Sequence, residues 1–148
     1  MYSKFVFYEL ISTVLVGNNP RALEYNPHNN NIYVANVDAD TISVIDKSNH
    51  TVVSVIDVGD SPIGIEYNPH NNNIYVANQN TDDVSVIDSN TNTLIDVVSV
   101  DEQPIELEYN PHNNNIYVAN YDSNTISVID SETNTVIDTI PVGNYPWR

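Results

Sequence analysis

The sequence contains no cysteine, and only four of its 148 residues are lysine or arginine. Without cysteine the chain forms no disulfide and offers no thiolate for catalysis or for an iron–sulfur cluster. Twenty aspartates and glutamates oppose the four basic residues, which gives a formal net charge of −16. Nucleic acids and anionic membrane surfaces attract positive charge, so this balance argues against both as partners.

Long hydrophobic runs are also missing, and no stretch of 18 apolar residues is present to insert into a membrane. The start of the chain is hydrophobic but is interrupted by Lys4 and Glu9, and no signal-peptide cleavage site is visible. The sequence has no nucleophile elbow, no phosphate-binding loop and no HExxH zinc motif. We therefore expect a binding or structural protein and not an enzyme.

What the sequence has in abundance is repetition. The stretch YNPHNNNIYVAN occurs three times without a change, and each copy begins 42 residues after the previous one. A period of about 40 to 45 residues, with several strands per unit, is typical of β-propeller blades. The three copies are Tyr25–Asn36, Tyr67–Asn78 and Tyr109–Asn120.

Each unit reads as four short strands separated by turns rich in Asn, Asp and Ser. In the first unit the strands are ALEYNP, NIYVAN, TISVID and TVVSVIDVG. Asn in the NPHNNN segment supplies the positive φ that a tight hairpin needs. No segment has a 3.6-residue apolar period, so no helix is predicted. Ile42 and Val44 fall on one face of their strand and Ile45 on the other, which predicts a sheet packed between neighbouring sheets.

The predicted fold class is therefore all-β, a β-propeller segment of about three four-stranded antiparallel blades plus an N-terminal orphan strand. Residues 10–20 match the end of the third unit, and residues 1–19 are expected to form the orphan fourth strand of a blade. The blades are expected to cover residues 20–61, 62–103 and 104–145. Residues 146–148 would begin a further first strand or form a tail.

The unit resembles the YVTN β-propeller repeat of archaeal surface-layer proteins and related bacterial proteins. The resemblance rests on the YVAN strand end, the SVID strand and the TNTVIDTIPVG strand with its following proline. The chain departs from the family in having NPHN in place of SPDG, and only three units where family members carry enough to close a ring. The resemblance implies an extracellular or cell-surface structural or adhesive module that binds a protein or glycan surface ligand. The competing expectation is a propeller scaffold in an enzyme or redox complex, with a ligand or partner at the channel mouth.

The copy number bears on the expected partners. Propellers close with about four to eight blades, and three blades would leave two apolar faces exposed. Two copies would supply six blades through twofold symmetry, which predicts a homo-oligomer. A fragment of a longer array, or an open stack with blades of a larger assembly, explains the same shortage.

The tips between the second and third strands differ among the units and carry carboxylates. Oxygen ligands of this kind suit calcium, the one cofactor we consider. Asx residues that cap a hairpin would produce the same pattern. The candidate calcium ligands are Asp38, Asp40, Asp82, Asp83 and Asp122. The loops between blades also differ, with Arg21, Asp60 and Glu102 at distinguishing positions.

The first strand of each unit carries a glutamate at one repeat position: Glu24, Glu66 and Glu108. The resemblance places this strand along the central channel, where a ring of carboxylates would raise one another's pKa and attract a cation. Alternatively, a backbone amide, a hydroxyl or water satisfies each carboxylate.

Two other kinds of candidate site recur or stand out on expected surface turns. One histidine recurs at the same repeat position of each unit, at His28, His70 and His112, and the blades are expected to hold these three rings too far apart to share a metal. The single glycosylation sequon begins at Asn49. No catalytic residue is predicted.

Overall fold

The computed structural model describes residues 12–146, which form three four-stranded antiparallel sheets. Blade 1 contains β1 (Pro20–Asn26), β2 (Asn31–Asn36), β3 (Thr41–Asp46) and β4 (Thr51–Asp57). Blade 2 contains β5 (Pro62–Asn68), β6 (Asn73–Asn78), β7 (Asp83–Asp88) and β8 (Thr93–Ser99). Blade 3 contains β9 (Pro104–Asn110), β10 (Asn115–Asn120), β11 (Thr125–Asp130) and β12 (Thr135–Pro141).

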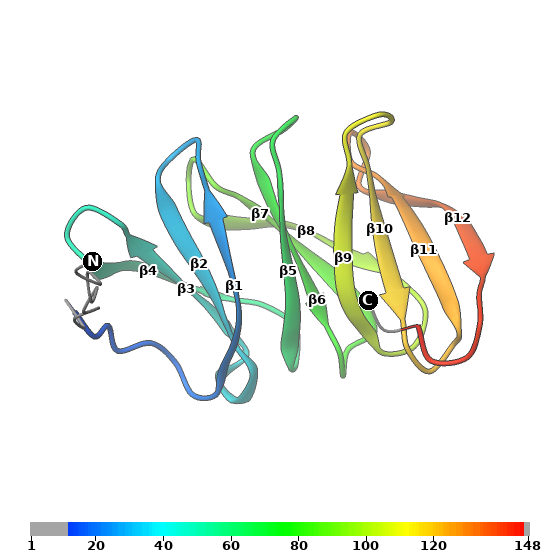
Figure 1. Cartoon of the computed structure of the whole chain (residues 1–148), viewed down its shortest axis with the longest axis horizontal. Coiled ribbons are helices and arrows are strands. Elements are labelled where there is room, and N and C mark those ends of the chain that lie inside the picture. Colours follow the sequence, from blue (N-terminus) through cyan, green and yellow to red (C-terminus); the bar gives the residue numbers. More distant parts are fainter. Residues whose placement is uncertain (1–11, 147–148) are drawn as a thin grey trace, which may run out of the picture.

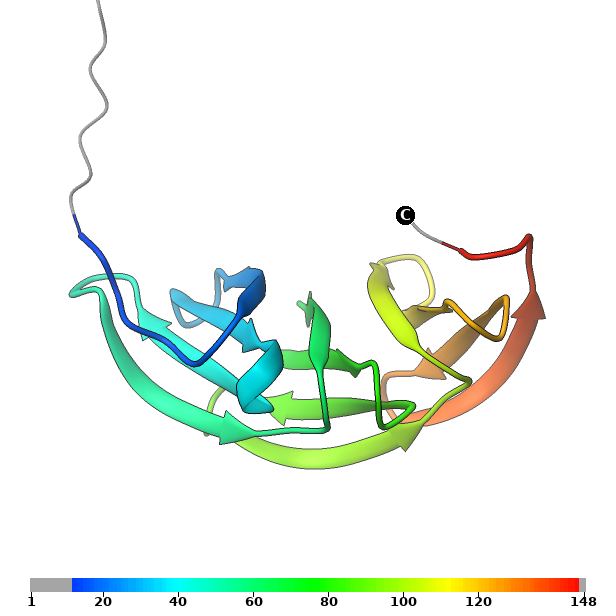
Figure 2. The ribbon, with the colours of Figure 1, turned by 90° about the horizontal axis from the view of Figure 1, so that it is seen from below.

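The blades stand side by side with their first strands, β1, β5 and β9, next to one another (Figure 1). Figure 2 shows the three blades as an open arc, with the first strands on the concave side and the fourth strands, β4, β8 and β12, on the convex side. Within each sheet the strands follow chain order. The all-β propeller segment expected from the sequence is confirmed.

The expected orphan strand falls mostly on residues 1–11, which lie outside the described residues, as do residues 147–148 of the expected tail. Residues 12–19 carry no strand. Within the described part, no helix has the length and apolar character needed to cross a membrane.

Left-handed residues end the turns at the same place in every unit. Asn30, Asn72 and Asn114 close the first hairpin of each blade with φ of 61°, 62° and 59°. This confirms that the NPHNNN segment uses Asn for its positive φ. None of the described glycines has a positive φ. Asparagine and aspartate tolerate the left-handed region because their side chains can bond the local backbone.

The prediction that the chain has no helix is wrong at one point. Val37–Ala39 forms a short 3-10 helix, η1, between β2 and β3. The tip turns through residues of helical geometry before Asp40 ends it with φ of 53° and ψ of 38°. The corresponding tips of blades 2 and 3 are hydrogen-bonded turns, so the helix is a local variant of a turn that is too short to give an apolar period.

The hydrophobic core lies between the blades. Blade 1 contributes Ile42 and Val44 to the cluster it shares with blade 2, and both side chains are fully buried. A second cluster joins blades 2 and 3 and includes Tyr75, Val86 and Ile116. Ile45 points to the opposite face from Ile42 and Val44 and is 9% exposed. Because blade 2 contributes side chains to both clusters, it is covered on both faces, as the two-sided apolar pattern predicts.

Blades 1 and 3 each keep one uncovered face. Leu23 is 68% exposed on the outer face of blade 1, whereas its counterpart in blade 2, Ile65, is 7% exposed. Ile140 is 40% exposed on the outer face of blade 3, whereas its counterpart Val98 is 6% exposed. The repeat thus places apolar side chains where a neighbouring blade is needed to cover them.

Candidate functional site

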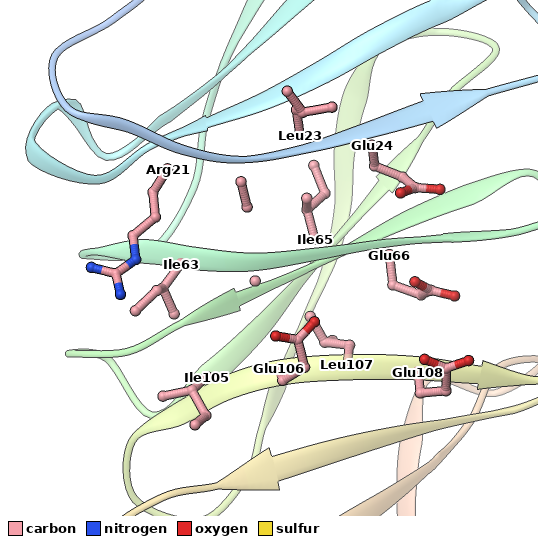
Figure 3. Close-up of a pocket in the computed structure, with 12 residues that line it drawn as sticks. Arg21, Leu23, Glu24, Ile63, Ile65, Glu66, Ile105, Glu106, Leu107 and Glu108 are labelled. Carbon is pink, nitrogen blue, oxygen red and sulfur yellow. The ribbon is translucent and has the colours of Figure 1, made fainter. Parts of the chain in front are cut away.

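A cavity of about 600 Å³ lies along the concave side of the arc. Four residues from each first strand line it, and Figure 3 shows these side chains from β1, β5 and β9. The lining residues span 21–24, 63–66 and 105–108. The first strands therefore line this cavity, in the position that the resemblance implies for them.

The three expected glutamates sit at one level of this wall. Glu24, Glu66 and Glu108 each pair with the tyrosine of the second strand in their own blade, Tyr33, Tyr75 and Tyr117. Figure 3 shows their carboxylates towards the same end of the cavity. The equal register follows from the constant repeat length, which puts the same strand position at the same height in each blade.

A fourth carboxylate, Glu106, also lines the cavity. Sequence reasoning missed it because the corresponding residues of the other units are Ala22 and Gly64, so no repeat drew attention to it. The sequence feature that could have revealed Glu106 is its difference from the other two units, which have a small residue at this position.

Burial raises the pKa of Glu66 to about 7. The backbone N–H of Tyr109 donates to Glu66 Oε1 at 3.2 Å and lowers the pKa, while the charges of Glu24, Glu108 and Glu106 raise it. Burial also raises the pKa of Glu24. The mutual repulsion expected from the sequence thus acts on Glu66, but removal from water is the larger cause. Glu66 exchanges its proton near neutral pH.

The opposite end of the cavity carries Arg21, the one basic side chain of the lining (Figure 3). Between the two ends, Gly64 lets β9 approach β5 closely. A Cβ atom at Gly64 would lie 2.6 Å from the carbonyl oxygen of Ile105. The strands β5 and β9 therefore lie close together at the centre of the wall. Four carboxylates and a single guanidinium line the cavity.

The acidic tips act mainly as caps for the loops between blades. Asp40 Oδ1 accepts from the backbone N–H of Ser61 at 3.0 Å, and Asp82 Oδ1 accepts from that of Gln103 at 2.9 Å. In blade 3 the amide oxygen of Asn124 does the same for Tyr145, at 2.7 Å. Because an amide replaces the carboxylate here, the position requires an acceptor and not a charge.

The remaining tip aspartates do not gather either. Asp38 Oδ1 accepts from Asn19 Nδ2 at 3.2 Å, Asp83 Oδ1 accepts from Asn78 Nδ2 at 2.6 Å, and Asp122 is exposed. Across residues 12–146 no three His, Cys, Asp or Glu side chains lie close enough together to hold a metal ion. The structure therefore does not bring the five candidate calcium ligands into one site.

The histidines and the sequon lie on exposed turns. His28, His70 and His112 each belong to the first hairpin turn of a different blade, and His70 Nε2 lies 3.7 Å from Glu132 Oε1. Asn49 is exposed on the turn between β3 and β4, where its Oδ1 accepts from the backbone N–H of Thr51 at 3.0 Å. None of these side chains lines the cavity.

Sequence reasoning also missed a polar contact that joins neighbouring blades. Tyr33 Oη donates to Asn92 Oδ1 at 2.7 Å, and Asn29 Nδ2 donates to the carbonyl oxygen of Ser89 at 2.8 Å. The same contact recurs between blades 2 and 3 through Tyr75, Asn71, Asn134 and Ser131. Its signal was the unchanged Asn and Tyr of the repeated stretch, whose buried polar groups need partners.

Comparison with solved structures shows propeller proteins of similar fold. Hydrazine synthase of Kuenenia stuttgartiensis has a TM-score of 0.81 and 21% sequence identity, with 95% of this chain and 40% of that one covered. Apo AztD from Citrobacter koseri has a TM-score of 0.75 and 16% identity, covering 98% and 40%. Dihydro-heme d1 dehydrogenase NirN, solved in complex with DHE, has a TM-score of 0.74 and 14% identity, covering 88% and 29%.

The chain thus spans no more than 40% of the length of these structures. No curated protein matches the sequence. The resemblance to the YVTN surface-layer repeat is not confirmed beyond the propeller fold. A family description, Cytochrome D1 heme domain, matches residues 24–146. Because this match covers most of the chain, the protein belongs to the Cytochrome D1 heme domain family.

Proposed function

We propose that the chain is a three-blade part of a propeller scaffold in an enzyme or redox complex, with a ligand or partner held at the channel mouth. The family and two of the similar structures, a synthase and a heme d1 dehydrogenase, support this class of function. They favour the scaffold over the surface-adhesion module that the YVTN resemblance implies. The observation that carries the proposal is that the first strands of all three blades line one cavity.

The family implies a heme, and the wall of this segment does not fit one. Heme iron is held by His, Cys, Met or Tyr, and none of the twelve lining residues is of these types. All four histidines lie in turns away from the cavity. Four carboxylates against one guanidinium also disfavour the acidic side groups of a heme macrocycle. In this proposal the segment supplies channel wall, and no iron ligand.

The same wall selects its ligand by charge. Carboxylates in a partly buried channel attract cationic groups, and the attraction is stronger there than on open surface because water screens less. Glu24 and Glu66 stand at one end and Arg21 at the other, so a positively charged group is favoured at the glutamate end. The scaffold itself performs no reaction in this proposal, and its location outside the cell or at the cell surface stays a prediction.

The test uses two planar macrocycles of equal size and opposite charge, a tetracationic N-methylpyridyl porphyrin and a tetraanionic sulfonatophenyl porphyrin. We expect the 148-residue chain to bind the cationic probe and not the anionic one, as measured by absorbance titration. In a titration above pH 7, where Glu66 is ionised, Glu24→Gln and Glu66→Gln should weaken binding of the cationic probe several-fold, because each removes a charge from the wall.

The matched control is Glu132→Gln, which removes the same charge from an exposed turn outside the cavity. It should leave the affinity nearly unchanged. Equal weakening by the control and the channel variants would show that the probe senses only the net charge, and would contradict a site at the channel.

A further inference from the structure

The outer face of blade 3 repeats a surface that the chain elsewhere buries. Tyr75 and Ala77 of blade 2 are fully buried against blade 3. Their counterparts in blade 3, Tyr117 and Ala119, are only half-buried and line a second cavity, of about 490 Å³, together with Ile126. We call the interface between two adjacent blades a joint. The chain contains two complete joints, between blades 1 and 2 and between blades 2 and 3, and the outer face of blade 3 is a third copy of the surface that forms them.

The donor side of the inter-blade contact is assembled on this face. Asn113 Nδ2 donates to Tyr117 Oη at 3.0 Å, as Asn29 does to Tyr33 and Asn71 to Tyr75. In blades 1 and 2 the pair continues to a carbonyl oxygen and an Asn side chain of the next blade. Within residues 12–146 no following blade exists to supply these acceptors to Tyr117.

The acceptor side exists on the outer face of blade 1. The residues one repeat before Ser89 and Asn92 are Lys47 and His50. His50 has φ of 54°, the same as Asn92, so the turn presents its backbone alike. The backbone carbonyl of Lys47 can accept a hydrogen bond although lysine stands here in place of serine. That side chain extends over the ring of Tyr25, with Nζ 4.8 Å from the ring centre.

Charge at the centre of the two outer faces is complementary. In the joint between blades 2 and 3, Gly64 lies against Ile105. The counterpart of Gly64 on blade 3 is Glu106, and the counterpart of Ile105 on blade 1 is Arg21. If blade 3 packed against a blade 1, Glu106 and Arg21 would therefore be neighbours. The same two positions in the joint between blades 2 and 3 hold uncharged residues. The joint of blades 1 and 2 has Ala22 at the glycine position, so it tolerates a Cβ atom there.

We propose that the outer face of blade 3 docks on the outer face of blade 1 of a second copy of this chain. Tyr117 and Asn113 bond the Lys47 carbonyl and the His50 ring of the second copy, and Glu106 lies beside its Arg21. Two such joints, related by a twofold axis, close six blades into a ring, within the range that propellers use. The channel is complete only then, with Glu24, Glu66 and Glu108 contributed by each copy.

Docking requires one local rearrangement. Residues 143–146 of one copy and residues 17–20 of the other occupy the same repeat position, immediately before a first strand. Both cannot lie there at once. Tyr145 is held by Asn124 and packs on Tyr121 with ring centres 5.0 Å apart. The carbonyl oxygens of Asn19 and Asn18 are held in turn by the backbone N–H groups of Val37 and Asp38, so docking releases one of these two segments.

The test is the mass of the full chain in solution, measured by sedimentation and light scattering across a dilution series. We expect a two-copy species. Tyr117→Phe should raise its dissociation constant about tenfold, because the joint loses a hydrogen bond. Tyr75→Phe is the matched control: it removes the same hydroxyl inside the chain and should lower the melting temperature without shifting the dissociation constant.

A charge exchange tests the pairing directly. Glu106→Arg and Arg21→Glu should each weaken association, and the double variant should recover it, since only the joint between copies sets these positions together. A monomer at every concentration, or single variants whose defects simply add, would overturn the proposal.

This inference rests on the proposed function only in naming what completes the channel. A monomeric chain that still discriminates between the two porphyrins through Glu66 would refute the second copy alone. A two-copy species without such discrimination would refute the proposed ligand site alone.

Discussion

The hydroxyl of Tyr33 in blade 1 donates a hydrogen bond to the side-chain oxygen of Asn92 in blade 2, with 2.7 Å between the two oxygens. Tyr75 makes the same bond to Asn134 in blade 3 at 3.1 Å. Both tyrosines have no exposed surface, and burial raises the pKa of each phenol. The interfaces between blades are thus apolar clusters that also contain a small group of polar contacts.

Tyr75→Phe should lower the free energy of unfolding by about 1 to 2 kcal/mol, because it removes the hydroxyl that donates to the half-buried Asn134 Oδ1, while the Ser131 carbonyl keeps its bond from Asn71. Urea denaturation followed by circular dichroism measures this. Tyr25→Phe removes a hydroxyl that bonds Asn30 within its own exposed turn at 2.9 Å, and should cost clearly less. Equal losses for the two variants would show that the contact between blades contributes nothing special.

Stability should fall as pH rises from 5 to 8. Burial raises the pKa of Glu66 from 4.5 to about 7, so the folded chain holds this proton more tightly than the unfolded chain does. The stabilisation is full below about pH 4.5 and is lost as the pH passes through about 7. We expect a change of about 1 kcal/mol after allowing for solvent screening.

The variant that isolates this pH dependence is Glu66→Gln, which should flatten it. Glu132→Gln removes the same charge from an exposed turn and should leave the slope as it is. Denaturation midpoints at four or five pH values for both variants measure the difference. A slope that both variants reduce alike would assign the effect to net charge and not to the buried carboxylate.

Gly64→Ala should destabilise the chain by about 1 to 3 kcal/mol. The added methyl would lie 2.6 Å from the carbonyl oxygen of Ile105, and a backbone atom cannot move without shifting β9. Gly143→Ala is the control, since a Cβ atom there meets nothing within 4 Å. Thermal unfolding of both variants decides the matter, and a neutral Gly64→Ala would mean that the first strands can separate freely.

Asp82→Ala should destabilise the chain by about 1 to 2 kcal/mol, because the half-buried N–H of Gln103 loses its acceptor. Asp82→Asn should be close to wild type, since Asn124 fills this position in blade 3. Melting curves with and without millimolar calcium complete the test. A stabilisation by calcium that Asp82→Asn abolishes would return the tip aspartates to the role of metal ligands.

Much of the fold could be predicted because the repeat is nearly perfect. The second and third strands begin and end where the NIYVAN and TISVID segments do, since Asx-rich turns bound them on both sides. Glu24, Glu66 and Glu108 could be placed together because one repeat position means one height on the wall. Glu106 and the Tyr33–Asn92 bond could not, because one breaks the repeat and the other joins residues 59 apart.

By itself the sequence determined the unit: four strands, their register, the left-handed Asn at each hairpin and an apolar pattern on both faces. These are local matters of side-chain alternation and turn geometry, and a 42-residue period repeats them. Only the tertiary structure decided which carboxylates lie together in a partly buried cavity, which polar groups bond across the interface between blades and which blade faces stay uncovered. Those outcomes depend on how the blades stack, since burial and contact between distant residues arise when one sheet covers another.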